Sequence, residues 1–218
     1  MIWNKLDSIE AKLEGYFPFT PIGIVSRHIN KSAVNILDLG CGKGDPMLFI
    51  NRDKKYYTVG VDVYPQYINI CKKKKSHDKL INSDITKLDY PQNLYDIVLG
   101  IRILEHFTQE DGAKLLDQME KMARKQVIIV TPVEKFKQSK YDGNGYQEHK
   151  FIWKPSELRN RGYKVYLNGI KGFQKDSGDI TMAEKFIGFI GHILWVSFGW
   201  LPLIFPSIAA NMVAVKNI

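Results

Sequence analysis

Three glycines and one aspartate are spaced so that they could hold a nucleotide-like ligand. Gly40, Gly42 and Gly44 alternate within residues 38–44, Asp-Leu-Gly-Cys-Gly-Lys-Gly, which follow a short apolar run. Because these glycines lack Cβ atoms, the chain can turn sharply and bring backbone amides close to a ligand. Asp38 stands two positions before the first glycine. The segment therefore predicts a binding loop with an acidic residue at its start.

The spacing of these residues disfavours a dinucleotide. In the dinucleotide pattern GxGxxG the third glycine would stand at position 45, but here it is Gly44 and the next residue is Asp45. Asp38 would also repel a pyrophosphate, whereas it can accept hydrogen bonds from an ammonium group, directly or through water. The expected ligand is cationic and adenosine-like, and a nicotinamide dehydrogenase is disfavoured.

Two further aspartates extend the pattern. Asp62 follows the apolar run 57–61, and Asp84 follows the run 79–82. In this order and spacing, the chain between about residues 34 and 131 resembles the class I S-adenosylmethionine-dependent methyltransferases of the methyltransferase type 11 kind. The resemblance implies S-adenosyl-L-methionine as the cofactor.

The resemblance also implies roles for individual residues. It implies that Asp62 holds both ribose hydroxyls, a bidentate task that suits a carboxylate, and that Asp84 and Ile85 contact the adenine. The residues expected to bind the cofactor are Asp38, Gly40, Cys41, Gly42, Gly44, Asp62, Val63, Asp84, Ile85 and Ile101.

Two histidines are candidate catalytic residues, because ligands in open α/β sheets bind beyond the carboxyl ends of the strands. His106 lies in the segment 101–107, and His149 lies in the segment 146–151. The near-neutral pKa of histidine suits the deprotonation of a hydroxyl. Two alternatives stay open: His106 only packs under the cofactor at a helix start, and His149 is a solvated loop residue.

No catalytic metal is predicted. The segment 101–107 resembles the SEVLEHV-like segment of methyltransferases related to quinone and small-molecule O-methylation, in which a first acidic residue and a Glu-His pair can hold a divalent metal. In this chain the first acidic position is Arg102. Only Glu105 and His106 are left as ligands, and a cation stands where the metal would sit.

Short apolar runs alternate with helical stretches, and this alternation is typical of a parallel sheet covered by helices on both faces. Strands are expected at 34–39, 57–61, 79–82, 97–100, 127–130, 163–167 and 207–215, and helices at 46–51, 67–74, 109–124 and 155–161. Asp45 and Thr108 are expected to be N-caps. The predicted fold class is α/β, a Rossmann-like doubly wound sheet of about seven strands, mostly parallel with an antiparallel last strand.

The length of 218 residues and the apolar content of 44% predict a single methyltransferase domain over residues 1–218. Residues 1–31 are expected to form an N-terminal helical cap, since apolar residues recur there every three or four positions. Residues 180–206 are expected to form a hydrophobic helical insertion between the last two strands.

This insertion overlaps the stretch 186–215, which contains no Lys, Arg, Asp or Glu. Pro202 and Pro206 disfavour a transmembrane helix, and so does the run 209–215, which resembles the family's last strand in the same sheet. Three interpretations stay open: contact with a membrane surface, the wall of an apolar substrate pocket, and packing or a homodimer contact.

The formal charge of +8 includes the run Lys72 to Lys75, which predicts either a solvated helix end or attraction to anionic lipid or nucleic acid. Nucleic acid is disfavoured as a partner, because no recognisable module for it is present. The only two cysteines do not indicate a disulfide scaffold, and early charged residues do not fit a secretory signal. The expected location is cytoplasmic, with membrane association under the first interpretation of the insertion.

The sequence thus predicts an S-adenosylmethionine-dependent methyltransferase. O-methylation of a small-molecule, glycan or lipid-linked acceptor is the preferred activity. The alternative is a non-catalytic, regulatory S-adenosylmethionine-binding protein, because methyl transfer depends largely on positioning and requires no particular catalytic motif.

Overall fold

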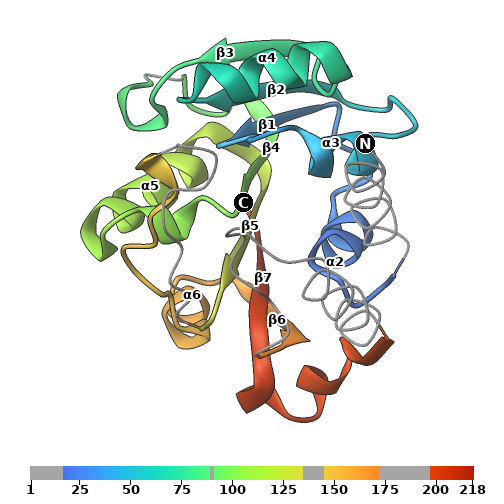
Figure 1. Cartoon of the computed structure of the whole chain (residues 1–218), viewed down its shortest axis with the longest axis vertical. Helices are drawn as coiled ribbons and strands as arrows, with labels where there is room; N and C mark the ends of the chain where they lie inside the picture. Colours follow the sequence, from blue (N-terminus) through green and yellow to red (C-terminus); the bar gives the residue numbers. More distant parts are fainter. Residues whose placement is uncertain (1–16, 89–90, 135–144, 172–196) are drawn as a thin grey trace, which may run out of the picture.

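A seven-stranded sheet organises the computed structural model, which describes residues 17–88, 91–134, 145–171 and 197–218 (Figure 1). The strands follow the order β3-β2-β1-β4-β5-β7-β6. Neighbouring strands are parallel except at β7, which runs antiparallel to both β5 and β6. The strands are β1 Asn35–Leu39, β2 Tyr57–Asp62, β3 Lys79–Asn82, β4 Tyr95–Ile101, β5 Ala123–Pro132, β6 Lys164–Ile170 and β7 Ala209–Asn217. The predicted fold class is confirmed.

Helices cover both faces of this sheet. In Figure 1, α2 lies on one side of the central strands, and α5 and α6 lie on the other. The α-helices are α2 Pro21–His28, α3 Asp45–Ile50, α4 Pro65–Lys74, α5 Gln109–Met122 and α6 Pro155–Asn160. Short 3-10 helices are η1 Ile85–Lys87, η2 Leu104–His106, η3 Gly145–Gln147, η4 Leu201–Leu203 and η5 Pro206–Ile208.

Each face of the sheet has its own apolar core. Leu37 of β1 packs in the cluster that contains Leu116 of α5, whereas its neighbour Ile36 packs in the cluster that contains Val25 of α2. Successive side chains of a strand point to opposite faces, so a strand buried on both sides is apolar throughout. This explains why the sequence shows short continuous apolar runs rather than alternating ones.

Several helix boundaries differ from the prediction by one or two residues, and two of these differences have a clear local reason. The N-cap of α3 is Gly44, with φ of 77°, and Asp45 is the first helical residue, where its carboxylate pairs with Lys74 at 2.6 Å. Helix α5 ends at Met122 rather than at residue 124, because Ala123 is already extended and begins β5. The predicted cap at Thr108 is confirmed, since its hydroxyl accepts a hydrogen bond from the amide of Asp111.

The lysine run forms the end of α4, as one of the two alternatives predicts. Lys72 to Lys75 are all exposed, and Lys75 closes the helix in a left-handed conformation with φ of 52°. Cations at a helix C-terminus are favoured by the helix dipole.

Parts of three predicted segments lie outside the described residues. Of the predicted N-terminal cap 1–31, residues 1–16, which carry most of the apolar pattern, lie outside the described residues. Helix α2, in the described part of this cap, packs on the sheet. Residues 180–196 of the insertion and 135–144 of the loop after β5 also lie outside the described residues. Among the helices that are described, none combines the length and the apolar character needed to cross a bilayer.

Asp96 at the start of β4 is predicted to stabilise the fold in a pH-dependent way. Its buried carboxylate accepts a hydrogen bond from the amide of Val34 at 2.8 Å and pairs with Arg124 at 2.9 Å and Lys125 at 3.4 Å. Burial raises the pKa of Asp96, but the Val34 amide and the two cations outweigh burial and lower it overall. A carboxyl with a lowered pKa in the folded state stabilises the protein above its unfolded pKa of about 4 and loses that contribution as the pH falls further.

Asp96→Asn should therefore lower the free energy of unfolding by about 1 to 3 kcal/mol at pH 7, because both ion pairs lose their anion. The difference from wild type should shrink as the pH falls below about 4. Urea unfolding at a series of pH values measures this. A difference that is the same at every pH would contradict the assignment.

Candidate functional site

The glycine loop connects β1 to α3, and its glycines are not equivalent. Gly40, Gly42 and Gly44 all have left-handed backbone conformations, with φ of 70°, 54° and 77°. A Cβ at Gly44 would lie 2.3 Å from Ser76 Oγ, and one at Gly40 would lie 2.6 Å from Ile103 Cδ1. A Cβ at Gly42 would meet no atom within 4 Å. Gly40 and Gly44 thus make room for neighbouring side chains, whereas Gly42 borders open space.

Asp62 ends β2 beside Gly42. Its Oδ2 accepts a hydrogen bond from the Gly42 amide at 2.9 Å, and its Oδ1 accepts one from the Tyr64 amide at 2.8 Å. Burial raises the pKa of Asp62, although the two amide bonds act in the opposite direction. The two bonds fix the carboxylate beside the loop, and a carboxylate has further lone-pair sites for ligand hydroxyls.

The other residues expected to bind the cofactor follow the ends of neighbouring strands. Asp84 lies beyond β3 and caps η1, accepting hydrogen bonds from the amide and the hydroxyl of Thr86 at 3.0 and 2.7 Å. Ile85 and Ile101 are buried, and Val63 is half-buried. Strands β1 to β4 are parallel, so their carboxyl ends, and these residues, share one edge of the sheet. Their contact with a cofactor stays a prediction.

Asp38 lies beneath the loop, with 2% of its surface exposed. Its Oδ2 is 3.1 Å from Nε2 of His77. Its Oδ1 is buried and has no hydrogen-bond partner among the described residues. Oδ1 is therefore the oxygen that could accept the predicted hydrogen bond from an ammonium group. That bond stays a prediction.

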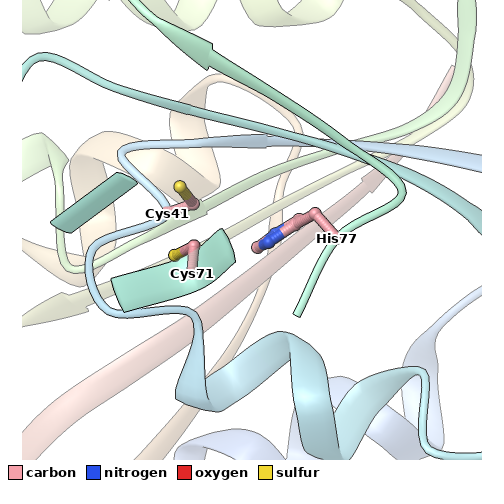
Figure 2. A group of neighbouring side chains, drawn as sticks. All are labelled: Cys41, Cys71 and His77. Atoms are coloured by element: carbon pink, nitrogen blue, oxygen red, sulfur yellow. The ribbon is translucent and has the colours of Figure 1, made fainter. Parts of the chain in front are cut away.

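A thiol and imidazole cluster that the sequence did not predict lies under the same loop. Cys41, Cys71 and His77 are neighbours (Figure 2), and one ligand atom from each lies within 4.8 Å of the others. The His77 ring lies against Gly60 of β2, where a Cβ would be only 2.9 Å from the ring. A glycine inside a strand often marks such a close approach, so Gly60 was the signal that could have revealed this cluster.

The ionisable groups of this cluster influence one another. A hydrogen bond from Cys41 lowers the pKa of Cys71 to about 5 although burial opposes this, while the bond to Cys71 and burial raise the pKa of Cys41. Burial lowers the pKa of His77, but its bonds to Asp38 and Cys71 outweigh burial and raise that pKa to about 9. The charge of each thiol and of the imidazole thus depends on its hydrogen bonds to the other members of the cluster.

The two candidate catalytic histidines come together with Glu105 at the ends of β4 and β5. One ligand atom from each of Glu105, His106 and His149 lies within 4.8 Å of the others, and the two imidazole centroids are 5.2 Å apart. Thr131 donates a hydrogen bond to Glu105 Oε2 at 3.2 Å. The carbonyl of Glu148 lies 3.2 Å from His106 Nδ1 and can only accept, so Nδ1 carries the proton and Nε2 is the basic nitrogen of the neutral ring.

His149 is not the solvated loop residue of the alternative interpretation. It is half-buried, and its Nδ1 is buried without a hydrogen-bond partner among the described residues. Burial and the neighbouring charges of His106 and Arg102 lower the pKa of His149 to about 4. His149 is therefore neutral at pH 7 and a weak base.

This cluster also bears on the prediction that the chain uses no metal. That prediction counted Glu105 and His106 as ligands, and the structure adds His149 as a third. One carboxylate and two imidazoles are a donor set that suits a divalent transition metal. Arg102, close enough to lower the pKa of His149, acts against a second cation there. The absence of a catalytic metal stays a prediction.

Known proteins resemble this chain in sequence. Residues 36–126 match the family model described as a methyltransferase domain. An uncharacterized protein of Methanocaldococcus jannaschii is 26% identical over 151 residues, which are 67% of this chain and 63% of that protein. Ajmaline N-methyltransferase of Rauvolfia serpentina is 26% identical over 106 residues, which are 46% of this chain and 36% of that protein. The chain thus covers less than two thirds of the length of these curated relatives.

A solved structure shares the fold. The crystal structure of an S-adenosylmethionine-dependent methyltransferase from Archaeoglobus fulgidus matches with a TM-score of 0.58 and 18% identity, over 94% of this chain and 98% of that one. The shared fold agrees with the domain match in sequence and with the glycine loop between β1 and α3. Residues 36–126 thus resemble a methyltransferase domain, and the chain has the fold of that S-adenosylmethionine-dependent methyltransferase.

Proposed function

We propose that this protein binds S-adenosyl-L-methionine at the edge of the sheet formed by the glycine loop and Asp62, and transfers its methyl group to an acceptor. The observation that carries the proposal is the open space at Gly42, whose amide is bonded to the buried carboxylate of Asp62. A backbone with room for a ligand beside a fixed carboxylate suits an adenosine whose ribose hydroxyls need an acceptor.

Binding measurements test the first half of this proposal. Calorimetric titration of the purified protein should give binding of S-adenosylmethionine and of its demethylated product, and no binding of NADH. Binding of NADH alone would overturn the proposal. Incubation with cofactor labelled in the methyl group and with cell extract, followed by fractionation into small molecules, lipid, glycan, protein and RNA, then identifies the class of acceptor.

O-methylation of a small-molecule, glycan or lipid-linked acceptor is the activity that we favour. When bound, S-adenosylmethionine supplies a methyl group activated by its sulfonium. A hydroxyl acceptor must lose its proton as its oxygen forms the new bond, and a positioned imidazole can accept that proton. His106 supports this assignment, because Glu148 holds its Nδ1 as a donor and leaves Nε2 as the basic nitrogen. An amine acceptor is the competitor, since one relative is named an N-methyltransferase.

His106→Asn is predicted to slow methyl transfer to a hydroxyl by about 10²- to 10⁴-fold, the usual contribution of a general base. Asparagine can still donate to the Glu148 carbonyl, so the loop contact is preserved while the Nε2 base is lost. Single-turnover transfer of labelled methyl measures the rate, and calorimetry should show cofactor affinity unchanged within a few-fold.

His149→Asn is the matched comparison for this experiment. Because its pKa is about 4, His149 is the weaker base, and we expect a smaller loss of rate. Equal rates for wild type and both variants over the whole pH range would remove the histidines from the mechanism and would favour an acceptor that reacts without losing a proton.

A non-catalytic S-adenosylmethionine-binding protein is the second candidate. Its support is the weak basicity of His149 and the positive charge of Arg102 beside it, which leave His106 as the one effective imidazole base of the cluster of Glu105, His106 and His149. This candidate predicts tight binding of the cofactor with no labelled product in any fraction of the extract.

For the insertion at 180–206, contact with a membrane surface is the proposal we retain. Apolar side chains are exposed in its described part, namely Phe198, Trp200, Leu203, Ile204 and Phe205. Exposed apolar and aromatic side chains on a basic protein are typical of interfacial binding. Sedimentation with anionic liposomes tests this proposal, and failure to sediment would favour the pocket or dimer interpretations.

A further inference from the structure

We propose that Cys41, Cys71 and His77 form a binding site for a thiophilic metal ion of the zinc(II) class, beneath the glycine loop. The three side chains come from the loop, from α4 and from the turn before β3, and they are neighbours in Figure 2. Both cysteines of the chain are used. This inference goes beyond methyl transfer and does not depend on it.

The separations of the ligand atoms suit such an ion. Bonds of about 2.3 Å to sulfur and about 2.0 Å to nitrogen, at tetrahedral angles, place ligand atoms roughly 3.5 to 3.8 Å from one another. The three ligand atoms here lie within 4.8 Å of one another. Small side-chain rotations therefore suffice to bring them to bonding distance.

His77 is oriented as metal-binding histidines usually are. Its Nε2 lies 3.1 Å from Asp38 Oδ2, and a carboxylate on one ring nitrogen holds the imidazole so that the other nitrogen can face the metal. The other nitrogen, Nδ1, lies 2.9 Å from the Ser76 hydroxyl. Since Ser76 can rotate its hydroxyl hydrogen away, Nδ1 is available as a ligand and the Ser76 oxygen is a candidate fourth ligand.

The residues of this cluster are buried. Cys71 is fully buried, and Cys41 and His77 are 5% and 8% exposed. Cysteine binds a metal as its thiolate, and the bound ion would supply the cation that a buried thiolate needs, because an unpaired charge is costly to bury. A closed site with cysteine and histidine ligands is characteristic of structural zinc, whereas catalytic zinc keeps one position open. We therefore expect the ion to fix the loop to α4.

The sulfur ligands distinguish the metal preference of this site from that of the cluster at Glu105. Sulfur selects soft and borderline ions, whereas the Glu105, His106 and His149 cluster has only oxygen and nitrogen donors and lies near Arg102. A spectroscopic signal that requires sulfur therefore reports the site beneath the loop alone.

Cobalt(II) titration tests the proposal on the full chain, kept reduced with a phosphine and stripped of metal with a chelator. We expect a thiolate-to-cobalt charge-transfer band that saturates at one equivalent and is displaced by zinc(II). Cys41→Ser and Cys71→Ser should each lose or greatly weaken the band. The matched control is His149→Asn, which removes the other candidate cluster and should leave the band unchanged.

Two measurements on the wild-type chain avoid variants that fail to fold. X-ray absorption of the zinc-loaded protein should show two sulfur ligands and at least one imidazole nitrogen, and zinc should protect both thiols from a thiol reagent. A zinc shell of only nitrogen and oxygen, or a chain whose thiols oxidise to a disulfide and never give the cobalt band, would overturn the proposal.

Discussion

Asp62→Asn is expected to weaken S-adenosylmethionine binding by about 10- to 100-fold, since each lost charge-assisted hydrogen bond contributes about 1.5 to 3 kcal/mol. The carboxylate oxygens already accept hydrogen bonds from the amides of Gly42 and Tyr64. An asparagine has one oxygen, so it cannot accept from both amides and also serve two ribose hydroxyls. Calorimetric titration with the cofactor measures the affinity, and thermal unfolding checks that the variant is folded.

Asp78→Asn is the matched control for this variant. Asp78 also accepts two hydrogen bonds, from the amide and the hydroxyl of Thr58 at 2.7 and 2.9 Å, but it does so at the amino ends of β2 and β3. The Asp78→Asn variant should be less stable than the wild type but should bind the cofactor with the same affinity. If the Asp62 and Asp78 variants bound the cofactor equally well, the ribose assignment would be wrong.

The second large effect is expected in the glycine loop, where one alanine substitution should reduce cofactor affinity and another should reduce the stability of the fold. A Cβ at Gly42 meets nothing in the protein but enters the open space next to Asp62, so Gly42→Ala should lose most of its cofactor affinity. The free energy of unfolding of this variant should fall only by the cost of an alanine in the left-handed conformation, about 1 to 2 kcal/mol.

Gly44→Ala should instead damage the fold. Its Cβ would lie 2.3 Å from Ser76 Oγ and 2.9 Å from Cys71 Sγ, both of which are buried. The overlap adds about 1 to 3 kcal/mol to the left-handed penalty. Chemical denaturation and calorimetry on both variants separate the two outcomes. A Gly42 variant that binds normally would mean that the ligand does not approach this part of the loop.

The sequence was sufficient for the sheet and for the shared edge at which the three aspartates lie. The runs before Asp38 and Asp62 are apolar because β1 and β2 lie inside a covered parallel sheet, whereas β3, which precedes Asp84, is the edge strand and is only partly buried. In such a sheet the residues that follow the strands must share one edge, so the order of the aspartates alone predicts that they lie together. This prediction uses only the local sequence pattern and requires no knowledge of contacts between distant segments.

The remaining parts of the site depend on contacts between distant segments. His77 reaches Asp38 only because β2 brings Gly60, a residue without a side chain, between them. His149 joins His106 because the chain after β5 returns to the end of β4, where the amide of Lys150 bonds to the carbonyl of Glu105. The cap of α3 was misassigned for a local reason: Asp45 is a good cap, but the left-handed Gly44 precedes it and takes that position.

The strand order also sets a sequence of events during synthesis. Strand β7, Ala209–Asn217, is made after the six other strands of the sheet as described, yet it lies between β5 and β6. Until β7 leaves the ribosome, β6 has no neighbour in the sheet as described, and β5 has an unpaired edge. The nascent chain therefore presents an open apolar edge that another chain could join, and molecular chaperones would have the most to protect at that stage.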